Sequence, residues 1–439
     1  MATEGITHRE FLEAIGQPLV LVEPDLAPVV AARRQPRHVW LFRLLSLILI
    51  AIGQEALFRW EFPFPEVHGF NRISYQMMAQ GHRDLTRLIQ QGLVYDRLLV
   101  ESEPDGFSEV HSLNLYGFRG ADFAIEPPRG RRRILLLGDS VTEGMGAGDS
   151  ATIACEFERR LISQGESAEV INLGVIAATL DHLTVLARDA ITLLRPTDAI
   201  VILYANDMPA SPYNPAFDDP PKDFRPWKQT WWKPRFVTLF GLFLDNKPFY
   251  HRWPHSPIRF FAAVPDGTNP WSDGKKPPQA LDPELFRQMK WGKLNPWLSG
   301  QSTDMPKQLS HDFTKDGSPE RHLARLAELC RSVGARLLIA YVPFCGVLST
   351  HYVPSLVRLD MDPHTAEALA TDPIYHRQNA ELAEVCSRLH LPLADTTDDL
   401  IQAERSGVPQ YWEYDTHPRP AGYATIARRI QQAFQAAAQ

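Results

Sequence analysis

Residues able to perform acyl transfer together are spread along the chain. Ser140 follows one apolar run, Asn206 follows another, and His417 lies near the C-terminus with Asp415 two residues before it. A serine hydroxyl becomes a nucleophile when an imidazole takes its proton and an acid orients that imidazole. The backbone N–H groups of Ser140 and Gly174, with the Asn206 amide, would bind the oxyanion of the intermediate. This set therefore indicates serine-based chemistry on an acyl group.

The elements expected to position these residues alternate between strand and helix. Helical stretches are expected at about 153–161, 179–194, 319–333, 378–389 and 421–435. Short apolar runs, expected as buried strands, lie at 133–137, 169–173, 198–204, 335–342 and 391–395. This alternation predicts an α/β fold with a doubly wound, parallel, five-stranded sheet. Because the carboxyl ends of parallel strands share one edge, Ser140, Gly174 and Asn206 should meet there.

The same residues form ordered motifs, each at the end of an expected strand. They are Gly138-Asp139-Ser140, Asn172-Leu173-Gly174, Ala205-Asn206-Asp207 and His417-Pro418. In this order they resemble the blocks of the SGNH (GDSL) hydrolase family. The resemblance covers about 131–204 and then about 317 to the end. Asn114 and the run Gly117-Phe118-Arg119-Gly120 also look like the lead-in of membrane-anchored bacterial members. The resemblance to this family implies a flavodoxin-like fold and the activity of a serine esterase.

Two positions depart from the family pattern. Ala205 replaces the glycine usual in the third block, and Tyr414 stands three residues before His417, where the family carries an aspartate. The nearby acids are Asp415 and Glu413. An Asp-x-His spacing looks similar to relatives that acetylate or deacetylate exported polysaccharides. Side chains alternate in an extended loop, so the side chains of both acids could face the His417 imidazole. Asp415 is favoured because it is closer to His417 in sequence and has the shorter side chain. A serine–histidine dyad held by a backbone carbonyl stays open.

The N-terminal region carries a candidate membrane anchor. Residues 39–53 are apolar except for Arg43 and Ser46, and arginines precede them. This length is at the lower limit for crossing a bilayer. The positive-inside rule places the N-terminus in the cytoplasm and the rest on the periplasmic or extracellular side. A cleaved signal peptide and a buried helix are the alternatives. The expected organisation is a tail at 1–38, an anchor at 39–59, a lead-in at 60–130 and a hydrolase domain at 131–439.

Within the hydrolase domain, a long insertion interrupts the alternation at about 208–315. It is rich in proline and tryptophan and contains an apolar stretch at 236–244. Insertions of this length at the carboxyl end of a strand are usually functional. The interpretations are a subdomain with its own aromatic core, a substrate lid, or a surface resting on the membrane.

Composition and spacing exclude several other classes. The formal net charge of −7 argues against nucleic acid as the main partner. Four cysteines lack C-x-x-C spacing and the histidines lack metal-ligand spacing, so neither a metal nor a cofactor is expected. No phosphate-binding loop is present, because the glycines after Ser140 lack the lysine that such a loop needs. The sequence does not predict an oligomeric state or a disulfide.

The favoured hypothesis is a serine esterase that removes an acyl group, with acetyl favoured, from a carbohydrate or a cell-envelope polymer. Lipid esters are a further substrate option because of the apolar stretch at 236–244. The first alternative is a membrane-tethered acyltransferase that passes the acyl group to a polysaccharide hydroxyl. The second is a non-catalytic envelope scaffold that keeps the fold. Retention of serine, asparagine and histidine together argues against the scaffold.

Overall fold

The computed structural model describes residues 37–61, 70–79, 97–208, 258–259, 271 and 276–437. The chain divides into two units, residues 1–54 and 55–439. Helix α2 (Arg37–Glu61) has 25 residues and exposes most of its large apolar side chains. Within it, His38–Leu57 has a mean hydropathy of 1.6 and is the one helical segment of the described residues that is long and apolar enough to cross a membrane. Its length and composition fit the predicted anchor.

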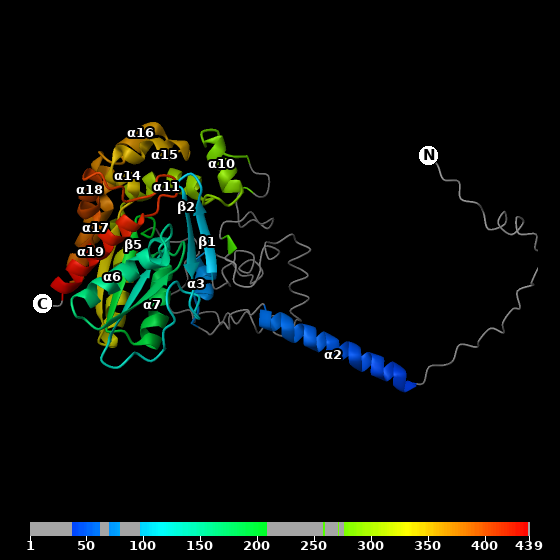
Figure 1. Cartoon of the computed structure of the whole chain (residues 1–439). Coiled ribbons are helices and arrows are strands. Elements are labelled where there is room, and N and C mark those ends of the chain that lie inside the picture. The colour runs from blue at the N-terminus through cyan, green and yellow to red at the C-terminus, as the bar shows by residue number, and fades with distance from the viewer. Residues whose placement is uncertain are drawn as a thin grey trace, which may run out of the picture. The chain divides into compact units, whose positions relative to one another are not determined.

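The larger unit is built on a five-stranded parallel sheet in the order β4-β3-β5-β7-β8 (Figure 1). The strands are β3 (Arg132–Gly138), β4 (Ala168–Gly174), β5 (Asp198–Tyr204), β7 (Arg336–Val342) and β8 (Leu393–Asp395). Strand order reverses direction between β4 and β5, as in doubly wound folds, where ligands bind outside the carboxyl ends of the strands at the switch point. The predicted α/β fold with five parallel strands is confirmed, and each strand lies within two residues of its expected position.

Helices cover both faces of this sheet. Successive side chains of a strand point to opposite faces, so each strand contributes apolar residues to both cores. Ile134 and Leu136 of β3 pack with α6 (Ile153–Ser163) and α19 (Pro420–Ala436). Leu135 and Leu137 pack in the other core, whose helices are α7 (Leu180–Leu194), α13 (Ser318–Ser332) and α17 (Arg377–Arg388). The second core also receives residues of α3 (Arg72–Ala79). The sheet is thus buried on both sides, which explains its continuous apolar runs.

A second sheet takes two strands from the predicted lead-in at 60–130 and one from the predicted insertion. Strands β1 (Arg97–Ser102) and β2 (Phe107–Ser112) form an antiparallel hairpin, and β6 (Ile258–Arg259) pairs in parallel with β1. The side chains of β1 alternate between half-buried and buried. The turn contains Pro104-Asp105-Gly106, with Gly106 at φ 75°. A Pro-Asp-Gly turn between two short runs is a hairpin signal that was available in the sequence.

The C-terminal end of the predicted insertion forms helices α10 (Pro283–Lys290) and α11 (Leu298–Ser310), which share a small apolar cluster with Leu359. Trp271 joins this cluster and packs edge-to-face on Phe286. The apolar stretch at 236–244 and most of the tryptophans of the insertion lie outside the described residues. The remaining short helices are α5 (Ser140–Glu143), α12 (Phe313–Asp316), α14 (Cys345–Leu348), α15 (Val353–Arg358), α16 (Pro363–Ala368) and α18 (Thr397–Arg405).

Candidate active site

Three of the predicted site residues form a continuous chain of hydrogen bonds. Ser140 begins α5 immediately after β3, and its Oγ lies 2.9 Å from His417 Nε2. His417 Nδ1 lies 2.7 Å from Asp415 Oδ1. Asp415 is fully buried, whereas Ser140 and His417 are each 8% exposed. Because a carboxylate only accepts hydrogen bonds, the Nδ1 atom carries the proton and Nε2 is free to accept the serine proton.

The environment of His417 favours its protonated form. Burial alone would lower the pKa of His417, but the Asp415 carboxylate outweighs burial and raises the pKa above the ordinary histidine value. The negative charges of Asp139 and Glu143 act in the same direction. A base with a raised pKa accepts a proton more readily in the transition state, so long as it is neutral when the reaction begins.

Backbone geometry explains how an Asp-x-His sequence places the acid. The Trp412 N–H donates to the His417 carbonyl at 2.9 Å, closing a short loop, and Thr416 in that loop has φ 63°. A left-handed residue between Asp415 and His417 turns the chain, so that the two side chains meet. The rival acid, Glu413, is 40% exposed and lies 3.4 Å from His351. The structure therefore brings Asp415, and not Glu413, to the imidazole.

Asp139 secures the turn that presents the serine. It is the N-cap of α5, and its Oδ1 accepts a hydrogen bond from the Val141 N–H at 2.8 Å. Its Oδ2 lies 3.2 Å from Ser140 Oγ. Burial raises the pKa of Asp139, although the Val141 N–H and the His417 charge oppose the change. These contacts give Asp139 a structural role in the turn.

Gly174 has a structural role in addition to the one expected. Its N–H donates to Asn172 Oδ1 at 2.9 Å, so this amide is already engaged within its own strand. A Cβ atom at Gly174 would overlap the backbone of Glu143 in α5. The glycine is therefore needed because the end of β4 and helix α5 approach closely. A role for the Gly174 N–H as an oxyanion donor stays a prediction.

Asn206 and the loop after β4 complete this edge of the sheet. Asn206 follows β5 directly, and its Oδ1 is buried without a hydrogen-bond partner among the described residues. In the loop after β4, the exposed Ala177 has φ 62°, a conformation uncommon for a residue other than glycine. Residues with a strained backbone cluster at functional sites. The sequence does not indicate this conformation, because alanine is not a residue that favours positive φ.

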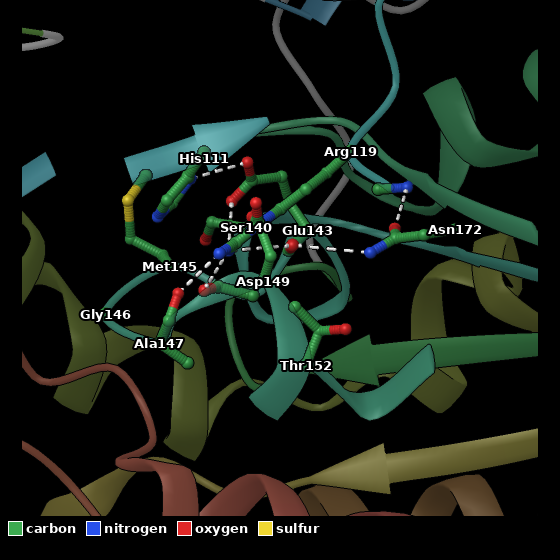
Figure 2. A network of polar contacts seen from close by, with 12 residues as sticks. His111, Arg119, Ser140, Glu143, Met145, Gly146, Ala147, Asp149, Thr152 and Asn172 are labelled. Carbon is green, nitrogen blue, oxygen red and sulfur yellow. Dashed lines mark hydrogen bonds and ion pairs between the residues drawn. The ribbon is translucent and has the colours of Figure 1, made fainter. Parts of the chain in front are cut away.

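A buried ionic network lies beneath the serine, as Figure 2 shows. Its centre is Glu143, the last residue of α5, whose side chain is fully buried. Glu143 Oε1 lies 2.8 Å from His111 Nδ1, and Oε2 lies 3.9 Å from the Arg119 Nη1 atom. Asn172 Nδ2 donates to the Glu143 carbonyl at 3.3 Å. Residues of the hairpin and of the segment after it thus enclose the end of the helix that begins with Ser140.

Arg119 ties the turn after α5 to the same network (Figure 2). Its guanidinium donates to the Gly144 carbonyl at 2.6 Å and to the carbonyl of Ala147, while Nε contacts Asp149 Oδ1 at 3.0 Å. A planar guanidinium with five donors suits this task, because it can satisfy several fixed acceptors at once. In the sequence Arg119 belongs to the run Gly117-Phe118-Arg119-Gly120, which does not by itself indicate this role.

The charge state of this network follows from burial and from the neighbouring cations. Burial alone would raise the pKa of Glu143, but His111, Arg119 and Arg72 outweigh it and lower the pKa to about 2. For His111, burial dominates and lowers the pKa. Its Nδ1 donates to Glu143, because an ionised carboxylate only accepts hydrogen bonds. Glu143 is therefore an ionised carboxylate inside the protein, stabilised by one ring N–H and by two buried arginines.

The described part of the chain contains no group of three histidine, cysteine, aspartate or glutamate side chains placed to hold a metal ion. The four cysteines are free thiols.

Neither a protein-family model nor a curated protein sequence matches the chain. Solved structures do resemble it at low identity. TesA is 13% identical with a TM-score of 0.34, covering 70% of this chain and 99% of its own. A variant of Axe2, an acetyl xylan esterase from Geobacillus stearothermophilus, is 11% identical with a TM-score of 0.34, covering 69% and 94%. A lipase/acylhydrolase from Enterococcus faecalis is 12% identical with a TM-score of 0.32, covering 70% and 96%. Similarity this distant does not decide the reaction.

Replacing Glu143 by glutamine should destabilise the folded protein. The amide keeps the size of the side chain but removes the fully buried negative charge that faces Arg72 and Arg119, at a cost of about 3 kcal/mol. Because the pKa of Glu143 is lowered from 4.5 to about 2, its stabilising effect is present above about pH 4.5 and is lost as the pH falls through about 2. Denaturant unfolding at several pH values should therefore show a difference between wild type and Glu143→Gln that shrinks on acidification.

The control for this prediction is Glu284→Gln. Glu284 is exposed and pairs with its helix neighbours Arg287 and Gln288, so its loss should leave the free energy of unfolding nearly unchanged. Equal stability of wild type and Glu143→Gln at neutral pH would contradict the importance assigned to the buried carboxylate.

Proposed function

We propose that the chain is a serine esterase of the SGNH (GDSL) type that cleaves acyl esters. The observation that carries the proposal is the hydrogen-bonded chain Ser140–His417–Asp415, with contacts of 2.9 Å and 2.7 Å. The acid is buried, the imidazole is held in one tautomer, and the hydroxyl lies at the carboxyl edge of a parallel sheet. This is the arrangement that nucleophilic acyl transfer requires.

In the proposed mechanism Ser140 Oγ attacks the ester carbonyl carbon while His417 Nε2 takes the hydroxyl proton. The carbonyl oxygen becomes an oxyanion, stabilised by the Ser140 N–H and the Asn206 amide. Collapse of this intermediate breaks the ester C–O bond, and His417 returns its proton to the departing alcohol. Water then attacks the acyl-serine with His417 again acting as the base, which releases the carboxylic acid and regenerates Ser140. Asp415 stabilises the imidazolium at each stage.

The proposed substrate is an acyl ester, with acetyl favoured, on a carbohydrate or a cell-envelope polymer. The Asp-x-His spacing and the apolar helix α2 motivate this choice.

A second candidate is transfer of the acyl group to a sugar hydroxyl. Acyl transfer would use the same residues. Ser140 and His417 are each only 8% exposed, and this favours transfer because restricted access of water protects the acyl-enzyme from hydrolysis. Product analysis with a polyol acceptor distinguishes hydrolysis from transfer.

We further propose that α2 is an uncleaved anchor, with the hydrolase domain on the periplasmic or extracellular side. The support is the apolar segment His38–Leu57 and the arginines that precede it in the sequence. An enzyme located there would meet envelope polymers and exported glycans.

Ser140→Ala should abolish ester hydrolysis and leave the fold intact. The substitution removes one hydroxyl whose contacts are to His417 and Asp139, and no buried apolar packing is lost. With p-nitrophenyl acetate as substrate, kcat should fall by roughly 10⁴-fold or more. The circular dichroism spectrum and the unfolding midpoint should match wild type. A folded variant with near-normal turnover would remove Ser140 from the mechanism.

The two neighbouring acids should differ sharply in their effect on turnover. Asp415→Asn should lower kcat by about 10⁴-fold, because an amide neither stabilises the imidazolium nor enforces the same tautomer. Glu413→Gln serves as the matched comparison, since Glu413 contacts His351 and not His417; its kcat should change less than about tenfold, about 1.4 kcal/mol. Steady-state kinetics at one pH suffices, and the reverse ranking would assign the orienting role to Glu413.

Full-length protein should sediment with membranes, whereas a chain beginning at residue 62 should be soluble. The apolar surface of α2 has to be covered by lipid or detergent, and its removal takes away that requirement. A phosphatase reporter fused after Gln439, active only when exported, should be active in cells. A reporter that works only in the cytoplasm would contradict the proposed orientation.

A further inference from the structure

The loop that carries the catalytic acid makes an unusual contact with the β1–β2 hairpin. Asp105 lies in the hairpin turn, far from the loop in sequence, and its side chain is half-buried. Its Oδ1 accepts a hydrogen bond from the Tyr414 N–H at 3.0 Å, and its Oδ2 accepts one from the Asp415 N–H at 2.8 Å. One carboxylate thus receives two consecutive backbone amides, the second belonging to the catalytic acid itself.

The Asp105 carboxylate is itself held in place. Ser102 Oγ donates to Asp105 Oδ2 at 2.6 Å, and Ser102 is fully buried at the end of β1. The Gly106 N–H donates to the Ser102 carbonyl at 2.9 Å, which closes the turn. Asp105 is therefore fixed to the hairpin by contacts that do not involve the loop, and a fixed acceptor can position the groups that donate to it.

The hairpin also contacts the site through apolar packing. Val100 and Phe107 form a cluster with Met145, from the turn after α5, and with Trp412. The rings of Phe107 and Trp412 are 4.8 Å apart, and Trp412 Nε1 donates to the Gly146 carbonyl at 2.8 Å. The loop that carries the acid and the loop that follows the nucleophile therefore meet on the same hairpin surface.

We propose that Asp105 is a positioning residue that sets the location of the Asp415 carboxylate, and through it the orientation of His417. This proposal rests on the proposed esterase function. In the described part of the chain, the Asp105 carboxylate is the acceptor for both the Tyr414 and the Asp415 N–H groups. Loss of the acceptor leaves two amides unpaired directly before the left-handed Thr416, where the chain turns to bring acid and imidazole together. Small displacements there are costly, because acid–base catalysis requires hydrogen-bond distances.

Asp105→Asn tests the proposal. An asparagine offers one carbonyl oxygen, and its NH₂ group opposes one of the two backbone N–H donors. We expect kcat for p-nitrophenyl acetate to fall by about 10- to 100-fold with KM changed less than about threefold. We also expect the apparent pKa of the kcat/KM profile to fall, since a displaced Asp415 no longer raises the pKa of His417. A role confined to stability would move neither the profile nor kcat of the folded enzyme.

Two further variants make the result specific. Glu103→Gln is the matched control, because Glu103 lies in the same turn but contacts the exposed Lys293; its kinetics should match wild type. Ser102→Ala removes the hydroxyl that fixes Asp105 while keeping the carboxylate, so kcat should fall in the same direction by a smaller factor. If Asp105→Asn does not fold, Ser102→Ala tests the same positioning role with a smaller change. Folded Asp105→Asn or Ser102→Ala enzymes with unchanged kcat and unchanged pH profiles would overturn the proposal.

Hydrogen exchange separates this proposal from the esterase function. Mass spectrometry of the peptide spanning 412–418 should show faster amide exchange in Asp105→Asn than in wild type, with the Glu103→Gln control unchanged. If wild type hydrolyses no ester, the function fails while this measurement still reports whether Asp105 holds the loop. Unchanged exchange in the folded variant would overturn the positioning role.

Discussion

The buried charge of Glu143 is the constraint to which much of the site is adapted. An ionised carboxylate inside a protein is strongly unfavourable unless donors and opposite charges surround it. In this chain the donors come from the hairpin and from the segment after it, through His111 and Arg119. Since Glu143 ends the helix that Ser140 begins, the segment that neutralises the charge also encloses the proposed nucleophile. The region before the first strand of the main sheet is thus part of the site.

The hairpin links parts of the site that are distant in sequence. Its turn accepts hydrogen bonds from the loop before His417, its apolar face packs on Met145 and Trp412, and its second strand supplies His111. Networks of this kind are cooperative, because each satisfied polar group fixes the geometry of the next. The proposed catalytic groups therefore lie on elements whose side chains are held by packing and by hydrogen bonds, as a preorganised site requires.

Sequence patterns predicted the sheet well because its strands are buried on both faces and read as continuous apolar runs. They also predicted Ser140 and His417 as site residues, and the structure brings the two side chains to 2.9 Å. The choice between Asp415 and Glu413 depended on the backbone of Thr416, whose left-handed conformation carries no sequence signal. Gly174 suggested a free backbone donor, but Asn172 two residues earlier accepts its N–H. The hairpin was missed although its Pro-Asp-Gly turn is a recognisable signal.

The central claim is that Ser140 is a nucleophile activated by His417, and covalent labelling tests it most directly. A fluorophosphonate reacts with an activated serine by displacement of fluoride and leaves a stable phosphonyl-serine. Intact-mass analysis followed by peptide mapping of the wild-type chain should show one adduct, located on Ser140. Labelling should be lost in His417→Ala while that variant stays folded. An adduct on another residue, or a wild-type chain that does not react, would contradict the account.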